Sequence, residues 1–174
     1  MPKEIVAPPL PLDLARRIGA VSDRVGGPDE VLPQTQLDWA LRWAHRGLHV
    51  FPCQSILGTP IPKKWYAVAT PEASHIVEWW SETSDADIAA VPELSGHFVI
   101  AVCGEAGEQS LAVLESRHGK LAPEFETDTR WGSRHLWFKG RALTSHDLLG
   151  IGLNVIGPGR FVFMPDSLAP DNFI

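Results

Sequence analysis

The sequence predicts one α+β domain, with a mixed or antiparallel sheet flanked by helices. Three observations support this fold class. Helical and strand patterns alternate from residue 35 to residue 118, whereas strands separated by turns follow from residue 133 onward. Residues 98–103 are an unbroken run of apolar or thiol side chains, which is typical of a strand buried on both faces. A chain of 174 residues is long enough to form one domain with its own hydrophobic core.

Residues 1–34 are expected to form an N-terminal arm that precedes the domain at 35–174. A proline-rich start favours extended backbone, and a short helix is expected over 12–25, where a Gly-Gly-Pro turn ends it. The arm is either an adapter for a partner or a segment packed on the domain, and the sequence does not decide between them.

A helix is predicted over 35–46. Thr35 is a suitable N-terminal cap, and Asp38 completes a capping-box pattern. Trp39 and Trp43 lie one turn apart beside the apolar stripe of this helix. They are interpreted as an exposed apolar patch and therefore as a candidate surface for a partner.

The middle of the chain continues with two helices and three strands. The first of these helices is expected to begin with Pro71, because proline is favoured at the first helical position. The second is expected to end at Gly119. The expected elements are a strand at 48–53 that Pro52 ends, a loop that ends in Lys63 and Lys64, a helix from Thr70 through Trp80, strands at 87–91 and 98–103, and a helix at 106–118 with Leu111, Ala112 and Leu114 inward.

The last third of the chain predicts strands only. A turn at 130–133 leads into a strand at 135–138. Strands at 152–156 and 160–164 are separated by Gly157-Pro158-Gly159, which is a hairpin signal.

Composition restricts the classes of function. The net charge of −6 argues against a protein that coats nucleic acid by charge alone. Between Arg117 and Arg160, however, cations outnumber acids by seven to four, so a local basic face is an alternative to scattered surface cations. The chain has no run of 18 apolar residues and no signal-peptide pattern, so no membrane association is expected. Cys53 and Cys103 fit a reducing cytoplasm without disulfides.

Six segments of the chain, taken in order, carry a resemblance to a known family. They are Ala40-Leu41-Arg42-Trp43-Ala44 with Gly47 and Val50-Phe51-Pro52, Ala69-Thr70-Pro71-Glu72 with Ile76 and Trp79-Trp80, Asp87-Ile88-Ala89, Val99-Ile100 with Val102, Gly132-Ser133-Arg134-His135-Leu136-Trp137-Phe138, and Gly152 through Ser167. Together these segments resemble the N-terminal domain of bifunctional DNA primase/polymerases, which belongs to the archaeo-eukaryotic primase superfamily. The likeness covers roughly residues 37–167 and implies a primase-like sheet flanked by helices.

The resemblance implies nucleotidyl transfer with two divalent metals, which need hard oxygen ligands. The resemblance implies an Asp-x-Asp at the end of the central strand and a third Asp on the later hairpin. In this chain those positions are Ala101, Cys103 and Asn154. All three carboxylates are replaced, so no catalytic residue, no metal site and no cofactor is expected.

The resemblance also implies a nucleotide-binding Ser-x-His strand, with Ser133 and His135 beside Arg130 and Arg134. Hydroxyl and cationic groups hold anionic oxygens, and Lys63 and Lys64 lie in a loop where the family often has a basic residue. His135 is equally well read as a half-buried strand histidine. Trp131 replaces a small residue of the family's turn and would fill the nucleotide cleft.

Other readings remain open. Glu105, Glu108 or Asp128 could act as relocated ligands for Mg²⁺ or Mn²⁺ in an active primase/polymerase. Cys103 and His135 are the candidates for a thiol hydrolase. The Trp79-Trp80 pair either packs in the core or stacks on bases. A pure protein-interaction domain is a further alternative.

The preferred interpretation is a catalytically degenerate primase/polymerase-like domain in the cytoplasm. It would act as a nucleic-acid, nucleotide or protein-binding module in DNA replication, a mobile element or a phage. The expected partners are single-stranded DNA or a nucleotide, and a replication protein or helicase acting in trans, because family members are often fused to a helicase.

Overall fold

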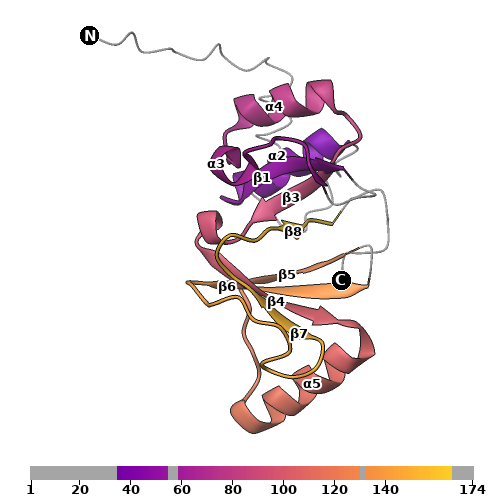
Figure 1. Cartoon of the computed structure of the whole chain (residues 1–174), viewed down its shortest axis with the longest axis vertical. Helices are drawn as coiled ribbons and strands as arrows, with labels where there is room; N and C mark the ends of the chain where they lie inside the picture. The colour runs from indigo at the N-terminus through magenta and orange to yellow at the C-terminus, as the bar shows by residue number, and fades with distance from the viewer. Residues whose placement is uncertain (1–34, 55–58, 130–131, 166–174) are drawn as a thin grey trace, which may run out of the picture.

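The computed structural model describes residues 35–54, 59–129 and 132–165. These form two four-stranded sheets and a small set of helices, which confirms the predicted α+β class. Helices α2 and α4 lie at one end of the molecule, α5 lies at the other, and the two sheets lie between them (Figure 1). The predicted arm at 1–34, with its short helix, lies outside the described residues, and so do Arg130 and Trp131.

The predicted elements are present over most of the described chain. The helices are α2 (Gln36–His45), α3 (Trp65–Val68), α4 (Ala73–Glu82), the 3₁₀ turn η1 (Glu93–Ser95) and α5 (Gly104–His118). The strands are β1 (His49–Gln54), β2 (Thr59–Pro60), β3 (Asp87–Val91), β4 (His97–Cys103), β5 (Phe125–Asp128), β6 (Ser133–Lys139), β7 (Leu153–Ile156) and β8 (Val162–Phe163). Within this part of the chain, no helix has the length and apolar character that a membrane crossing needs.

The strands pair antiparallel throughout the described ladders. The first sheet has the order β2-β1-β3-β8, and the second has the order β5-β6-β4-β7. The hairpin predicted from Gly157-Pro158-Gly159 is therefore wrong, because β7 pairs with β4 in the second sheet and β8 pairs with β3 in the first. This tripeptide carries the chain from one sheet to the other.

The capping box predicted for α2 is present. The Asp38 N–H donates to the Thr35 hydroxyl, and the Thr35 N–H donates to the Asp38 carboxylate. The exposed patch predicted for this helix is wrong, however. Trp39 and Trp43 are 2% and 4% exposed, because α2 packs on both sheets and Trp43 stacks on Phe125 of β5.

Two proline predictions are also wrong. Pro71 precedes α4 instead of starting it, since Thr70 is held extended by its bridge to Val50 and the helix begins at Ala73. Pro52 does not end β1, which continues to Gln54. Pro52 lacks an N–H donor, but its carbonyl still accepts a hydrogen bond from the Ile61 N–H, so a proline is tolerated within this strand.

Three hydrophobic clusters fill the molecule. The largest joins α2 and α4 to one face of each sheet, through Val50 and Ile88 of the first sheet and Val99 and Trp137 of the second. Another lies on the opposite face of the first sheet, around Phe51. Of the Trp pair in α4, Trp80 is buried and Trp79 is partly buried against these clusters, which places both in packing contacts.

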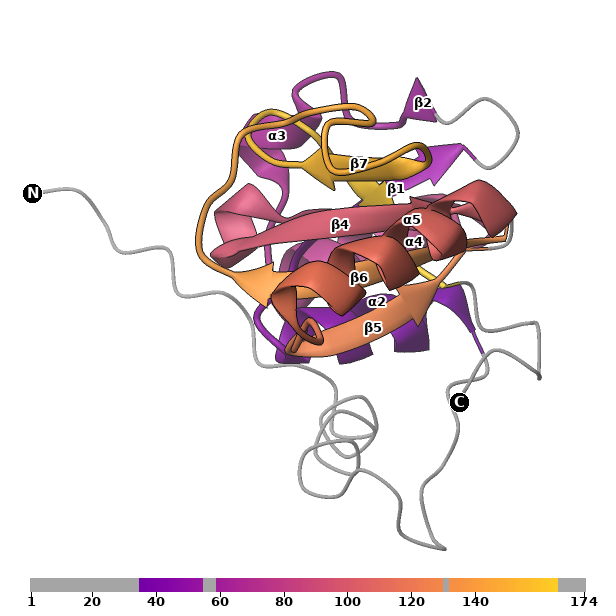
Figure 2. The same ribbon diagram turned by 90° about the horizontal axis from the view of Figure 1, so that it is seen from below.

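The third cluster lies between α5 and the outer face of the second sheet, which α5 crosses when the molecule is seen from below (Figure 2). The helix buries Leu111 and half-buries Leu114, but Ala112, predicted inward, is exposed. It starts at Gly104, two residues before the predicted start. Gly119 ends it, as predicted.

Candidate functional site

Five of the residues singled out from the sequence lie on one face of the second sheet. In the antiparallel register, Ala101 of β4 lies opposite Asn154 of β7 on one side and His135 of β6 on the other. Cys103 lies opposite Ser133. Alternate residues of a strand point to the same face, so these side chains share one surface. We call it the site face.

The site face looks toward the first sheet. Val99, Trp137 and Ile156 occupy the same face two residues from Ala101, His135 and Asn154, respectively. Those three residues belong to the cluster that includes the first sheet and α2. The candidate site therefore continues the central core, and α5 lies on the opposite side of the sheet.

The positions predicted to match the metal-ligand acids form an uncharged, hydrogen-bonded group. The Asn154 side-chain amide donates to the Cys103 Sγ at 3.5 Å. The Asn154 Oδ1 accepts the Asp147 N–H at 3.3 Å and lies 3.3 Å from the His146 Nδ1. Ala101 is buried and contributes no polar side-chain atom. The oxygen that Asn154 offers is thus already engaged.

His135 is a buried, neutral histidine. Its side chain is 6% exposed, and its Nδ1 has no hydrogen-bond partner among the residues that the structure describes. Burial lowers the pKa of His135 to about 4, because the protonated ring would lose its hydration. At pH 7 this side chain supplies no positive charge to a phosphate.

Hydroxyl groups lie beside His135 on the site face. Thr127 is opposite His135 in β5 and accepts a hydrogen bond from the Trp137 indole at 3.0 Å. Thr129 accepts the Ser133 N–H at 3.1 Å and positions the start of β6. The sequence analysis missed Thr127 and Thr129. The signal was present, since Thr-x-Thr precedes Ser-x-His with the same two-residue period.

Arg134 lies on the other face of the sheet, away from Ser133 and His135. Its guanidinium forms ion pairs with Glu108 of α5 at 2.8 Å and with Glu126 of β5 at 3.1 Å. The structure therefore does not bring Arg134 together with the two residues that it was predicted to assist. A residue between two site-facing residues of a strand must point the opposite way.

The remaining predicted cations are not gathered on the site face either. Lys63 and Lys64 are exposed between β2 and α3, and no hydrogen bond or ion pair in the described ranges joins them to β6. Arg130 lies outside those ranges. The basic stretch is partly neutralised, since Lys120 pairs with Glu115 and Lys139 with Glu124. Those cations lower the pKa of both glutamates by hydrogen bonding.

The acids proposed as relocated ligands do not converge. Glu108 is paired with Arg134, and Asp128 lies opposite Arg134 in the register, on the face away from Ala101. Glu105 accepts a hydrogen bond from Gln109 along α5. Over residues 35–54, 59–129 and 132–165, no group of three or more His, Cys, Asp or Glu side chains is arranged to hold a metal ion.

Cys103 and His135 share the site face without contacting each other through a hydrogen bond. The described partner of the Cys103 thiol is Asn154. Cys53, the other cysteine, is buried in the first sheet, and burial raises the pKa of its thiol to about 12. An adjacent base is one means of activating a nucleophilic cysteine, and the described residues place no such base within hydrogen-bonding distance of the Cys103 thiol.

The comparisons with known proteins identify the family of the chain. None of the curated proteins matches the sequence. The family model described as "Bifunctional DNA primase/polymerase, N-terminal" matches residues 40–172, which is most of the chain and includes every residue of the site face. The chain therefore belongs to the bifunctional DNA primase/polymerase N-terminal domain family.

Proposed function

We propose that this chain is a catalytically degenerate primase/polymerase domain, which binds nucleotide or single-stranded nucleic acid weakly but does not transfer nucleotidyl groups. The observation that carries the proposal is the convergence of Ala101, Cys103 and Asn154 at adjoining positions of the site face. These are the positions at which the resemblance places the acids of the family.

The residues present do not fit the divalent metals that the family implies. Mg²⁺ and Mn²⁺ prefer carboxylate, carbonyl and water oxygens. Ala101 offers no ligand atom, and Cys103 offers a soft sulfur. The Asn154 oxygen accepts the Asp147 N–H instead. Replacing three carboxylates with neutral groups also removes most of the Coulomb attraction for a dication.

A residual binding role rests on Ser133, His135 and the neighbouring threonine hydroxyls. The buried His135 Nδ1 is without a described partner, and a buried polar atom of this kind costs free energy until it is paired. A ligand group that reaches it would recover that free energy. Because His135 is neutral and Arg134 faces away, affinity for phosphate is low and falls further with salt.

We propose that this binding role serves DNA replication, or a mobile element or phage, because the chain belongs to a DNA primase/polymerase family. A replication protein or helicase acting in trans is the protein partner that fits such a module. A reducing cytoplasm suits the thiols of Cys53 and Cys103.

The test is primer synthesis and primer extension with Mn²⁺ and nucleotides. We expect no product. Mn²⁺ binding can be monitored by the loss of the EPR signal of the free ion. This binding should also be undetectable at millimolar Mn²⁺. Fluorescence anisotropy with labelled oligo(dT) should give a dissociation constant of about 10⁻⁴ M, within the non-specific range, that weakens with salt.

The matched control restores the acids in Ala101→Asp/Cys103→Asp/Asn154→Asp, and Cys103→Asp/Asn154→Asp serves if a carboxylate in place of the buried Ala101 prevents folding. Either variant should bind Mn²⁺ when circular dichroism shows that it is folded. A Mn²⁺-dependent product from the unmodified chain would overturn the proposal. If Ser133→Ala/His135→Gln binds oligo(dT) as well as the unmodified chain does, the site face is not the binding surface.

A further inference from the structure

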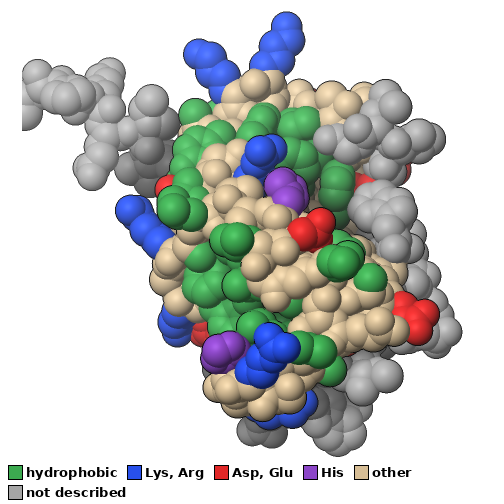
Figure 3. All heavy atoms as spheres, turned by 60° about the horizontal axis from the view of Figure 1, so that its bottom comes forward, with side chains coloured by type: hydrophobic (Ala, Val, Ile, Leu, Met, Phe, Trp, Pro, Cys, Tyr) green, Lys and Arg blue, Asp and Glu red, His purple; other side chains and the backbone are tan. Residues whose placement is uncertain are grey.

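An open groove lies between α5 and the turn that precedes β7, on the side of the second sheet away from the site face. It has a volume of about 610 Å³. Hydrophobic side chains gather in the middle of this end of the molecule, and basic side chains lie at its lower rim (Figure 3). The groove is lined by Ala106, Gln109, Ser110, Val113, Leu114, Arg117 and His118 of α5 and by Leu148, Leu149, Gly150 and Ile151.

Large apolar side chains in this groove are open to solvent. Leu148 is 79% exposed, Ile151 is 72% exposed and Val113 is 49% exposed. Single exposed apolar residues are ordinary, but several lining one groove mark a surface that binds another molecule.

The backbone that displays these side chains is anchored. The Ser110 hydroxyl of α5 donates to the Ile151 carbonyl at 2.8 Å, and the Gly152 N–H donates to the Asp147 carboxylate at 2.7 Å. A Cβ at Gly150 would lie 2.7 Å from the Ser110 Cβ, so the turn lies directly on the helix. The backbone of the turn is therefore held in place by contacts, so little backbone entropy is lost when a partner binds.

The charge of the groove selects its partner. None of the residues that line it is acidic, although the whole chain carries a net charge of −6. Arg117 and His118 lie at the end that the C-terminus of α5 forms. An apolar surface bordered by the Arg117 guanidinium, with no acidic side chain in its lining, is complementary to an apolar segment that carries carboxylates.

The lining also selects the conformation of the partner. The groove is formed by one helix face and one turn, and neither of them presents a strand edge, so strand addition is unavailable there. An amphipathic helix that lays its apolar stripe between two such walls is the fitting mode. We propose that this groove docks an acidic amphipathic helix of a partner protein. The docking is independent of the chemistry of the site face.

The test uses a labelled synthetic peptide of about 16 residues, long enough to form a helix, with Leu at i, i+3, i+4 and i+7 spacing and Glu elsewhere. A matched peptide carries Lys in place of every Glu. Fluorescence anisotropy on the full chain should show at least tenfold tighter binding of the Glu peptide. Ile151→Asp should weaken it about tenfold, and Arg117→Glu should reverse the preference toward the Lys peptide.

Leu143→Asp is the control for adding a charge at an exposed apolar residue, since Leu143 is 86% exposed but does not line the groove. Leu143→Asp should leave binding of the Glu peptide unchanged. Ser133→Ala/His135→Gln should also leave it unchanged, so a failure of the proposed function at the site face can be told apart from a failure of this proposal. Equal binding of the two peptides, or equal loss in Leu143→Asp and Ile151→Asp, overturns the proposal. Displacement of the peptide by oligo(dT) would also overturn it. So would a dimer of the unmodified chain, detected by sedimentation, that Ile151→Asp dissociates.

Discussion

His135 shows how burial limits the electrostatic role of a side chain. The residue lies beside Ala101 on the site face, and its ring is buried with the Nδ1 unpaired among the described residues. Desolvation lowers its pKa to about 4, so it is neutral at physiological pH. Any phosphate held here is therefore bound by hydrogen bonds and not by the charge of this histidine.

The lowered pKa predicts a pH dependence of stability. In the unfolded chain the pKa of His135 returns to 6.5, so between about pH 4 and pH 6.5 the unfolded state binds more protons. Above pH 6.5 the ring is neutral in both states, so its titration does not lower the free energy of unfolding. As the pH drops below 6.5, the free energy of unfolding falls, by about 3 kcal/mol near pH 4. Urea unfolding of the unmodified chain and of His135→Gln, at pH 7 and at pH 4.5, measures the difference. Gln does not titrate, so this variant should lose less stability; equal losses would contradict the assigned pKa.

At the residue scale, strand periodicity accounts for part of the arrangement of the site face. The two-residue period of strands is enough to place Ser133 with His135 and Ala101 with Cys103. The same rule shows why Arg134 faces away, although its neighbours in the sequence suggested otherwise. The links between strands were not predictable from periodicity, because the position of Asn154 opposite Ala101 depends on β7 pairing with β4.

At the scale of elements, the start of α5 depends on a close approach to β7. The Cys103 N–H donates to the Gly152 carbonyl at 2.8 Å. A Cβ on Gly107 would lie 2.8 Å from that same carbonyl oxygen. The helix can therefore cross this turn only because both positions are glycine. The sequence has glycines at both places, but it does not show that the two segments touch.

Gly152→Ala tests this contact. The new Cβ would lie 2.6 Å from the Gly107 nitrogen, and the backbone has a φ of +78°. Gly96→Ala is the matched control, since its φ is +74° with nothing within 4 Å of the new Cβ. We expect about 1 kcal/mol of destabilisation for the control, from the left-handed backbone alone, and at least about 2 kcal/mol more for Gly152→Ala, from the clash. Urea unfolding measures both, and equal values would show that the turn adjusts freely.

For the whole molecule, sequence patterns predicted least about the hydrophobic core that the two sheets share with α2 and α4. Strand periodicity identifies which residues are buried, but it does not say which sheet buries them. Trp39 and Trp43 were expected on the surface because only one helix face was considered, whereas α2 packs on both sheets. The predicted hairpin at 157–159 was wrong for the same reason, since β7 and β8 belong to different sheets. Fold class follows from local pattern, and the packing of sheets follows from long-range contacts.

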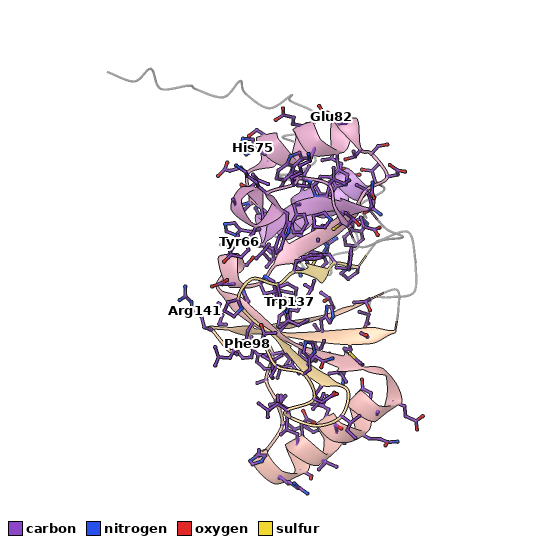
Figure 4. All side chains as sticks on the ribbon, in the orientation of Figure 1. Tyr66, His75, Glu82, Phe98, Trp137 and Arg141 are labelled. Carbon is purple, nitrogen blue, oxygen red and sulfur yellow. The ribbon has the colours of Figure 1, made fainter. Side chains whose placement is uncertain are left out.

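Trp137 connects these parts of the core. It is fully buried on the face of the second sheet toward the first (Figure 4), and it stacks on Phe125 with ring centroids 5.0 Å apart. Its cluster includes Val50 and Ile88 of the first sheet. If this cluster holds the two sheets together, damage in the second sheet must also loosen the first.

Trp137→Ala should therefore lower the free energy of unfolding by about 3–5 kcal/mol. Hydrogen exchange should show reduced protection of the amides of β1 and β3 as well as those of β4 and β6, because they lose a common core. The control is Phe138→Ala, in the same strand but on the face toward α5, where the side chain is half-buried. It should cost less and should affect α5 more than β1. Protection lost in the second sheet alone after Trp137→Ala would mean that the sheets are stabilised separately, and the site face would then belong to a unit that folds without the first sheet.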